Sequence, residues 1–169
     1  IKQVEDNISS DFEPMFQERQ LNYRFVNRIL HNNIVSDKTI IHNIMTNLFS
    51  NAIKFTPNGG SITLYLAQWE SEQDGVIMQY ISVHNTGSYI SDEEKEKVFG
   101  SFYKIENQSS FTGYGQSSTG IGLYLVKELV SSLGGRIEIR SSKKTGTAFR
   151  IYFPVEIAQE AAVNLEKNV

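Results

Sequence analysis

The 169-residue chain has no cysteine and no uninterrupted apolar stretch that approaches the roughly 18 residues of a membrane span. The absence of cysteine excludes a disulfide scaffold, a thiolate zinc site and a cysteine nucleophile. The N-terminus lacks the basic and then apolar layout of a secretory signal, and it does not begin with Met. We therefore expect a cytoplasmic domain that is a fragment of a longer protein.

The chain also lacks an excess of positive charge. Its 16 Lys and Arg face 19 Asp and Glu, so the formal net charge is −3. This balance gives no support to a surface that tracks nucleic-acid phosphates. Hydrophobic residues make up 40% of the chain, which argues against disorder, and the length suits one domain.

Helical and alternating apolar patterns follow one another along the chain. They predict helices over 8–20, 37–56, 91–98 and 120–133, and strands over 21–27, 33–35, 61–67, 76–84, 136–142 and 147–154. Hairpins join neighbouring strands, which favours an α+β sandwich. Pro154 is expected to end the last strand, and residues 104–119, rich in Ser, Gly, Gln and Asn, are expected to form a mobile loop.

Helical spacing groups residues on one side of each predicted helix. In the first helix Phe12, Met15, Phe16 and Arg19 share one side, and in the last helix Leu125, Leu129 and Leu133 do so. The helix over 37–56 has two apolar rows with a step of four, which together form a wide stripe. The rows are Ile40, Ile44, Leu48, Ala52 and Ile41, Met45, Phe49, Ile53.

A row of asparagines runs beside this stripe: Asn43, Asn47 and Asn51, with Lys54 one turn on. Asparagine is a poor helix former, so the row has a local cost. One interpretation is a solvated helix edge. The other is a ridge of amide oxygens that suits Mg2+, with Lys54 placed for a phosphate.

A second candidate is the segment Thr119 to Leu123, where Gly120 and Gly122 open a helix. Glycines allow close approach of a ligand to the backbone, and a helix N-terminus favours phosphate. A plain loop-to-helix junction is the alternative. Two further segments, VHNTG at 83–87 and FGSFYK at 99–104, read by themselves as a turn and as core aromatics.

Taken together and in this order, these segments resemble the catalytic ATP-binding domain (HATPase_c) of sensor histidine kinases, in the GHKL superfamily. NLFSNAIKFTPNGGSI is similar to the N box, SVHNTGSYIS to the first glycine box and VFGSFYK to the F box. STGIGLYLVKELVSSLGGRIEI is similar to the second glycine box with its following helix and strand, and TGTAFRIYFP to the closing strand. The resemblance implies a two-layer α/β sandwich of the Bergerat type, with a mixed, mainly antiparallel sheet, helices on one face and a flexible ATP lid over 104–119.

The resemblance also implies the domain limits and the site. It implies a linker from an upstream acceptor-helix domain over 1–7, the catalytic domain over 8–154 and a linker or tail over 155–169. Asn51 and Lys104 would be catalytic, and Asn51 with Asn47 would hold Mg2+. The residues implied to bind ATP are Asn47, Asn51, Lys54, Asn85, Gly87, Ile90, Phe102, Tyr103, Lys104, Thr119, Gly120, Ile121, Gly122, Leu123 and Thr147.

The first glycine box departs from the family pattern, which has Asp where this chain has Asn85 and Gly where it has Tyr89. Asn85 can still accept a hydrogen bond from adenine, but without charge assistance. Tyr89 would narrow the pocket or stack over the base. Ser118 replaces a lid glycine and Ser101 an F-box arginine. These changes keep open a degenerate, nucleotide-free module that regulates a partner by docking.

Asn47 stands where hydrolysing relatives carry a Glu that activates water, and Asn cannot act as a general base. This argues against an ATPase or a Ser/Thr kinase and favours a histidine kinase of a two-component phosphorelay. None of His31, His42 and His84 is followed by an acidic residue, as the family's acceptor His is. The implied partners are therefore an acceptor and dimerisation domain of the same protein and a response regulator, with no nucleic acid and no membrane contact by this domain. Whether the intact protein is anchored in an inner membrane stays open.

Overall fold

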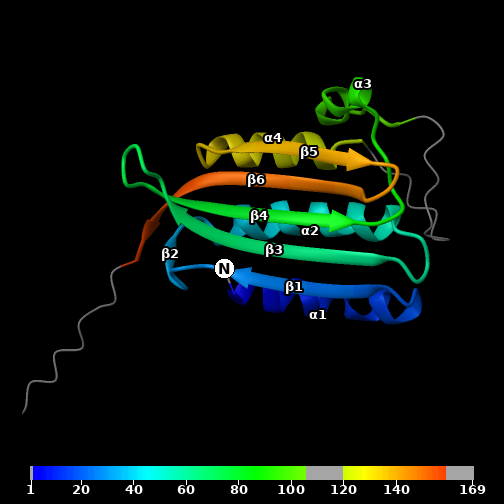
Figure 1. Cartoon of the computed structure of the whole chain (residues 1–169), viewed down its shortest axis with the longest axis horizontal. Helices are drawn as coiled ribbons and strands as arrows, with labels where there is room; N and C mark the ends of the chain where they lie inside the picture. The colour runs from blue at the N-terminus through cyan, green and yellow to red at the C-terminus, as the bar shows by residue number, and fades with distance from the viewer. Residues whose placement is uncertain (1, 106–119, 159–169) are drawn as a thin grey trace, which may run out of the picture.

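The computed structural model describes residues 2–105 and 120–158 (Figure 1). The elements, in chain order, are α1 (Lys2–Glu18), β1 (Asn22–Arg28), β2 (Ile34–Val35), α2 (Lys38–Phe55), β3 (Ser61–Glu70), β4 (Ile77–Asn85), α3 (Asp92–Lys95), the 3-10 turn η1 (Lys97–Phe99), α4 (Gly122–Ser132), β5 (Arg136–Ser142) and β6 (Gly146–Ile157). No helix among these residues is long and apolar enough to cross a membrane.

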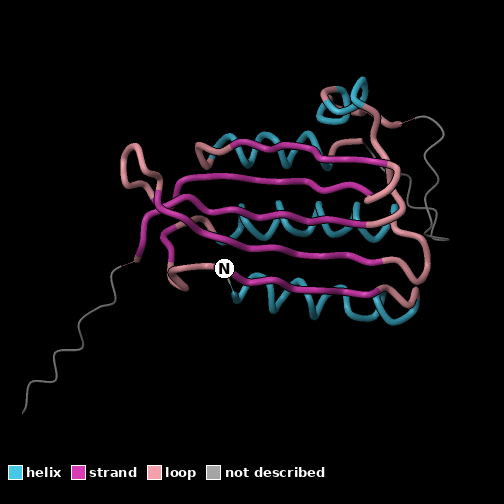
Figure 2. Tube along the Cα trace, viewed as in Figure 1, coloured by secondary structure: helices cyan, strands magenta, loops and turns pink. Residues whose placement is uncertain are grey.

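The strands form one mixed sheet in the order β1-β3-β4-β6-β5, and the short β2 pairs with the end of β6. Only β1 and β3 run parallel in the described part of the sheet, and the other pairs are antiparallel. Figure 2 shows α1, α2 and α4 behind the strands, on one face of the sheet. The expected two-layer α+β sandwich with a mainly antiparallel mixed sheet is therefore confirmed.

Helix α2 is the central element of the helical layer. Oδ1 of Asp37 accepts hydrogen bonds from the backbone amides of Thr39 (2.8 Å) and Ile40 (3.1 Å), which caps the helix at the expected place. The helix ends before Pro57, which cannot continue it. Its buried stripe, as expected from the two apolar rows, consists of Ile41, Ile44, Met45, Leu48, Phe49, Ala52 and Ile53.

The sheet has one face in the core and one face that no helix of residues 2–105 and 120–158 covers. Alternation along each strand sends every second side chain to the helices. The strand residues that pack in the core include Ile62, Leu64, Leu66, Ile81, Val83, Phe149, Ile151 and Phe153. The burial of these residues against α2 fixes the layer arrangement.

The first helix differs from its expected form. It starts at Lys2 instead of residue 8, and Met15 is 46% exposed, whereas Phe12 and Phe16 are buried. Arg19, on the same side as Phe12 and Phe16, is buried, and its guanidinium donates to the backbone oxygens of Ile53 and Thr56 at the end of α2. The hydrogen bonds satisfy carbonyl groups that a helix C-terminus leaves without partners.

The leucine row of α4 is not the most buried side of the helix, because Leu125 is 39% exposed. The fully buried residues are Val126 and Val130, with Leu129 and Leu133 partly buried beside them. The helix is thus rotated so that the valine row faces α2 and the sheet. A step of four recurs in both rows, so periodicity alone could not distinguish them.

The last strand also runs further than expected, because β6 passes Pro154 and ends at Ile157. Tyr152 is the last residue of β6 that pairs with β5, so this edge of the strand is open at Pro154. A proline is tolerated at an open edge because its missing N–H removes no ladder hydrogen bond there. Beyond it, Glu156 and Ile157 pair with β2.

A pair of leucine substitutions tests the core assignment. We expect Leu48→Ala to lower the free energy of unfolding by about 2–5 kcal/mol, because this fully buried side chain would leave a cavity. Leu125→Ala, the same change on an exposed helix face, should alter it by only about 0.5 kcal/mol. Urea titration measures both values, and equal losses would contradict the rotation of α4 described above.

Candidate functional site

The polar row of α2 forms the first part of the candidate site. Asn47, Asn51 and Lys54 are half-buried beside the apolar stripe, and Asn43 is exposed. Nδ2 of Asn47 donates to the backbone oxygen of Asn43 at 2.8 Å. This hydrogen bond fixes the amide of Asn47 so that its oxygen remains for another partner.

The start of α4 lies directly against this row. A β-carbon built on Gly122 would lie only 2.9 Å from Oδ1 of Asn47, so glycine leaves the Asn47 side chain in place at this approach. The first amides of a helix lack intrahelical acceptors and carry the positive end of its dipole. The fold therefore brings the amide oxygen of Asn47 to an N-terminus that favours anions. Ile121 is exposed and Leu123 is half-buried at the same helix start, and Thr119 lies outside the described residues.

The F-box segment is joined to the same place through Gly120. The backbone N–H of Phe102 donates to the oxygen of Gly120 at 3.0 Å. Gly120 has a φ of +72°, and a β-carbon there would lie 2.7 Å from the carbonyl carbon of Phe102. Phe102 itself is 71% exposed, and Tyr103 is half-buried. Residues 102 and 120 thus bring the two ends of the expected lid together; residues 106–119 lie outside the described part.

Two lysines from separate segments influence each other at this site. Partial burial and the positive charge of Lys104 lower the pKa of the Lys54 ammonium below its ordinary value. An anion placed between the two cations would relieve this repulsion and favour the charged form. Lys54 and Lys104 can therefore serve as a cationic pair for phosphates.

The end of β4 supplies the second part of the site. Asn85 is only 3% exposed, and its Nδ2 donates to Oγ of Ser88 at 3.0 Å. Thr147 lies opposite Asn85 in the β4–β6 register and is also buried. Its hydroxyl is 2.8 Å from that of Ser141, which in turn accepts a hydrogen bond from the backbone N–H of Ile90 at 2.9 Å.

The two parts of the site meet through the C-terminal end of α2. Gly87 has a φ of +82°, and a β-carbon there would lie 2.4 Å from Cδ of Pro57. The first glycine box therefore packs on the residue that ends α2, after Asn51 and Lys54. In Figure 1 the end of β4, the start of α4 and the β5–β6 turn lie at the same end of the molecule.

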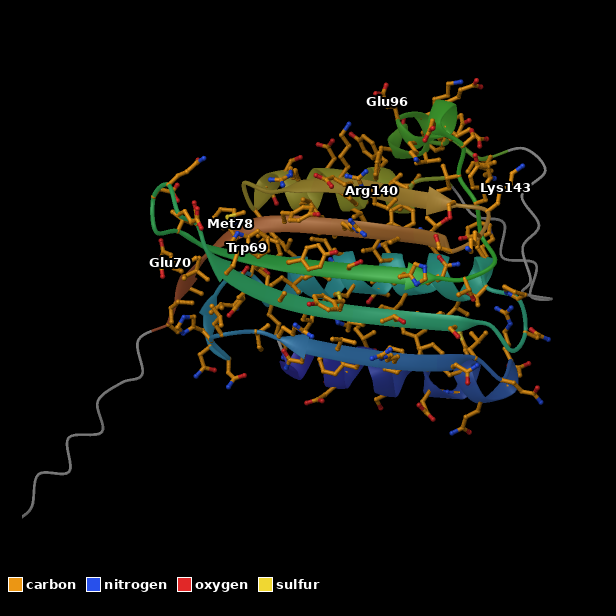
Figure 3. All side chains as sticks on the ribbon, viewed as in Figure 1. Trp69, Glu70, Met78, Glu96, Arg140 and Lys143 are labelled. Carbon is orange, nitrogen blue, oxygen red and sulfur yellow. The ribbon has the colours of Figure 1, made fainter. Side chains whose placement is uncertain are left out.

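Tyr89 lies beside this part of the site and is 40% exposed. Nζ of Lys143, from the β5–β6 turn, lies 5.5 Å from the centroid of its ring. A cation over an aromatic ring is held by the ring quadrupole. Figure 3 labels Lys143 at the same end of the sheet.

The sequence did not identify Ser88 and Ser141, which hold Asn85 and Ile90 in place. Ser88 lies between two glycine-box positions and Ser141 at the end of β5, so neither had a distinctive neighbour. Only strand register brings Ser141 opposite Thr147. No signal in a single sequence encodes that register here.

Metal ligands of the common acidic kind are absent from the described residues, which contain no group of three His, Cys, Asp or Glu side chains that could hold an ion. Asn47 and Asn51 offer amide oxygens, which suit a hard cation such as Mg2+. Two neutral ligands do not compensate a divalent charge. The donor set therefore fits a cation that arrives with phosphates and water, not a resident ion.

Comparison with known proteins agrees with this arrangement. The family model for histidine kinase-, DNA gyrase B- and HSP90-like ATPases matches residues 36–157. The chain is 31% identical over 147 residues to the sensor protein CiaH of Streptococcus pneumoniae. This match covers 87% of this chain and 31% of CiaH. It is 36% identical over 135 residues to the autoinducer 2 sensor kinase/phosphatase LuxQ of Vibrio harveyi, covering 79% of this chain and 15% of LuxQ.

Solved structures show the same fold. The catalytic domain of histidine kinase ThkA superposes with a TM-score of 0.72 at 23% identity, covering 91% of each chain. Full-length ShkA in complex with AMPPNP superposes with a TM-score of 0.74 at 21% identity, covering 95% of this chain and 31% of ShkA.

The chain belongs to the histidine kinase-, DNA gyrase B- and HSP90-like ATPase family. It spans about a third of the length of CiaH and a smaller part of LuxQ. The resemblance inferred from the motifs is therefore confirmed at the level of the family and the fold.

A pair of glycine substitutions tests the contact between Gly120 and the F box. Gly120→Ala should lower the free energy of unfolding by about 1–3 kcal/mol more than Gly59→Ala. Both glycines have a positive φ, +72° and +74°, but a β-carbon on Gly59 would meet nothing within 4 Å. Denaturant titration gives the difference, and equal costs would show that the segments do not touch in solution.

Proposed function

We propose that this chain is the catalytic ATP-binding domain of a sensor histidine kinase, which positions Mg-ATP for transfer of the γ-phosphoryl group to a His on another domain. The observation that carries the proposal is the contact of Asn47 on α2 with Gly122 at the start of α4. There an amide oxygen meets a helix N-terminus suited to phosphate, and Lys54, further along the same helix, would add positive charge together with Lys104. The relatives that the chain resembles include CiaH and LuxQ, both named as sensors.

The phosphate end of the nucleotide would lie against α2, the F box and α4. The residues proposed there are Asn47, Asn51, Lys54, Phe102, Tyr103, Lys104, Thr119, Gly120, Ile121, Gly122 and Leu123. Asn51, with Asn47, would hold Mg2+ together with phosphate oxygens. The bound ion would supply neutralisation of the triphosphate charge.

The adenine end would lie at the close of β4, against Asn85, Gly87, Ile90 and Thr147. Because the amide NH2 of Asn85 donates to Ser88, its Oδ1 is the atom left to accept from the adenine amino group. Gly87 lets the backbone pack on Pro57, which sets the distance between this pocket and the phosphate end. The base and the triphosphate would thus be held by one helix end.

The site has no general base at position 47, where Asn47 stands, and this determines which kind of acceptor the phosphoryl group can reach. An amide cannot take a proton from water, so the site favours transfer to an acceptor that another segment supplies. Phosphoryl transfer depends mainly on positioning and electrostatic stabilisation, which Lys54, Lys104 and the α4 amides can provide. Asn51 and Lys104 would act on the transferred group directly.

The proposed partners are the acceptor and dimerisation domain of the same protein and a response regulator. The ThkA structure in complex with response regulator TrrA, a fold relative, supports the second partner. We place the catalytic domain over about 8–154, with linkers on either side, and in the cytoplasm. A linker is consistent with the small share of CiaH that the chain covers.

A degenerate module without nucleotide is the second candidate. The neutral Asn85 and the bulky Tyr89, with Lys143 over its ring, favour it because both change the proposed adenine pocket. Calorimetric titration with Mg-ATP separates the two candidates. Heat release and thermal stabilisation support the kinase, and neither effect at millimolar nucleotide would support the degenerate module.

Phosphotransfer provides the direct test. We expect the isolated chain to bind ATP without phosphorylating itself, and the addition of the native acceptor hairpin to give phosphohistidine. Asn51→Ala should abolish the transfer because it removes the proposed Mg2+ ligand, while Asn32→Ala, at an exposed position, should leave it intact. ATP binding without transfer to the hairpin would refute the kinase proposal.

Restoring the family carboxylate tests the adenine pocket. Asn85→Asp should tighten ATP binding by about 1 kcal/mol, or about fivefold in Kd, because a charge-assisted hydrogen bond replaces a neutral one. Asn32→Asp makes the same change of charge at an exposed site and should leave the Kd unaltered. Unchanged or weaker binding by Asn85→Asp would mean that Asn85 does not face adenine.

A further inference from the structure

The face of the sheet opposite the helices carries most of the chain's arginine. The chain has six arginines, and only Arg19 lies in the helical layer. The other five alternate with core residues along β1, β5 and β6 and therefore point away from the helices. They are Arg24, Arg28, Arg136, Arg140 and Arg150.

Aromatic side chains occupy the middle of the same surface. Tyr80 and Tyr152 face each other across β4 and β6, with ring centroids 5.1 Å apart. Tyr65 and Trp69 on β3 contact them at 5.7 Å and 6.2 Å, respectively. We call this surface the open sheet face: the five arginines, these four rings, Val26, Met78, Glu138, Pro154 and Glu156. Figure 3 shows Trp69, Met78 and Arg140 on it.

The charge of the open sheet face is opposite to that of the molecule. Five arginines against Glu138 and Glu156 give it a formal charge of +3, so the rest of the chain carries −6 in a total of −3. Glu138 is already engaged by Arg136 at 3.3 Å and by the hydroxyl of Tyr152 at 3.4 Å. The other four arginines make no ion pair within the described residues.

Arg150 lies near the centre of the face, opposite Ser82 on β4. Its Nε is buried and has no hydrogen-bond acceptor in the described part of the chain. A buried donor without a partner costs free energy that an arriving acceptor would recover. On its other side Arg150 lies opposite Glu138 of β5, so the face combines guanidinium groups with aromatic rings around a single central carboxylate.

We propose that the open sheet face is a docking surface for an acidic protein segment that carries carboxylates beside aliphatic side chains. Tyr, Trp, Met and Arg are the residue types enriched in protein interfaces, and Lys, which is depleted there, is absent from this face. The planar guanidinium groups suit bidentate pairing with carboxylates. The docking surface goes beyond the proposed kinase function and lies on the opposite side of the sheet from the helical layer.

The geometry disfavours two other occupants. The rings tilt against one another, at 44° for Tyr80 with Tyr152 and 74° for Trp69 with Tyr152, and the guanidinium of Arg136 lies 4.3 Å over the Tyr152 ring. They do not form the free, flat platform on which nucleic-acid bases stack. A second copy docked face to face would bring two surfaces of charge +3 together, which is repulsive.

Trp69 gives a direct readout, because it is the only tryptophan of the chain and is 39% exposed. The probe is a short peptide of alternating glutamate and leucine, added to the full chain. We expect a blue shift of Trp69 emission and reduced quenching by acrylamide, both of which weaken as salt rises. A peptide of lysine and leucine should have no effect.

Charge reversal locates the binding. The double variant Arg28→Glu, Arg140→Glu should weaken peptide binding at least about tenfold. The control is the double variant Lys38→Glu, Lys97→Glu, which makes an equal change of charge at exposed sites off this face and should weaken binding less than about twofold. Thermal melts verify that both variants fold. The proposal is overturned if Trp69 does not respond, if the two variants weaken binding equally, if an oligothymidylate of equal charge binds more tightly, or if Trp69 reports self-association without peptide.

Discussion

The burial of one side of α2 against the sheet is the constraint on which the rest of the structure depends. Leu48 and Phe49 are fully buried, and the cost of exposing them fixes the rotation of the helix about its axis. That rotation places Asn47, Asn51 and Lys54 at the edge of the buried stripe, toward α4. Hydrophobic packing thus positions polar groups that could not position themselves.

Close backbone approach is the second requirement. Gly120 meets the backbone of Phe102 and Gly87 meets the ring of Pro57 at distances that a β-carbon would not permit, and a β-carbon on Gly122 would displace the side chain of Asn47. Three separate segments can therefore converge on α2 without displacing it. The result is a site in which amides and a few lysines meet a triphosphate locally, within a domain of net negative charge.

Much of the fold could be read from the sequence, because local signals agreed with tertiary packing. The Asp37 cap, the stripe of α2 and the β3–β4 hairpin all appear where the pattern predicts them. The exceptions have a common cause. Leu125 and Val126 both have apolar neighbours four residues away, so tertiary contacts decided which of the two is buried. Pro154 ends a strand only if both edges of the strand are paired, and the pairing of β6 with β5 stops at Tyr152.

The sequence by itself determined the family, the order of the elements and the candidate residues, because these are local motifs with fixed spacing. Only the tertiary structure decided which of these residues touch, as Asn47 and Gly122 do. It also decided that Ser88 supports Asn85 and that Ser141 supports Ile90. The arginines show the difference most clearly. In the sequence they are scattered within an acidic chain, and the two-residue alternation of three strands gathers five of them on one face.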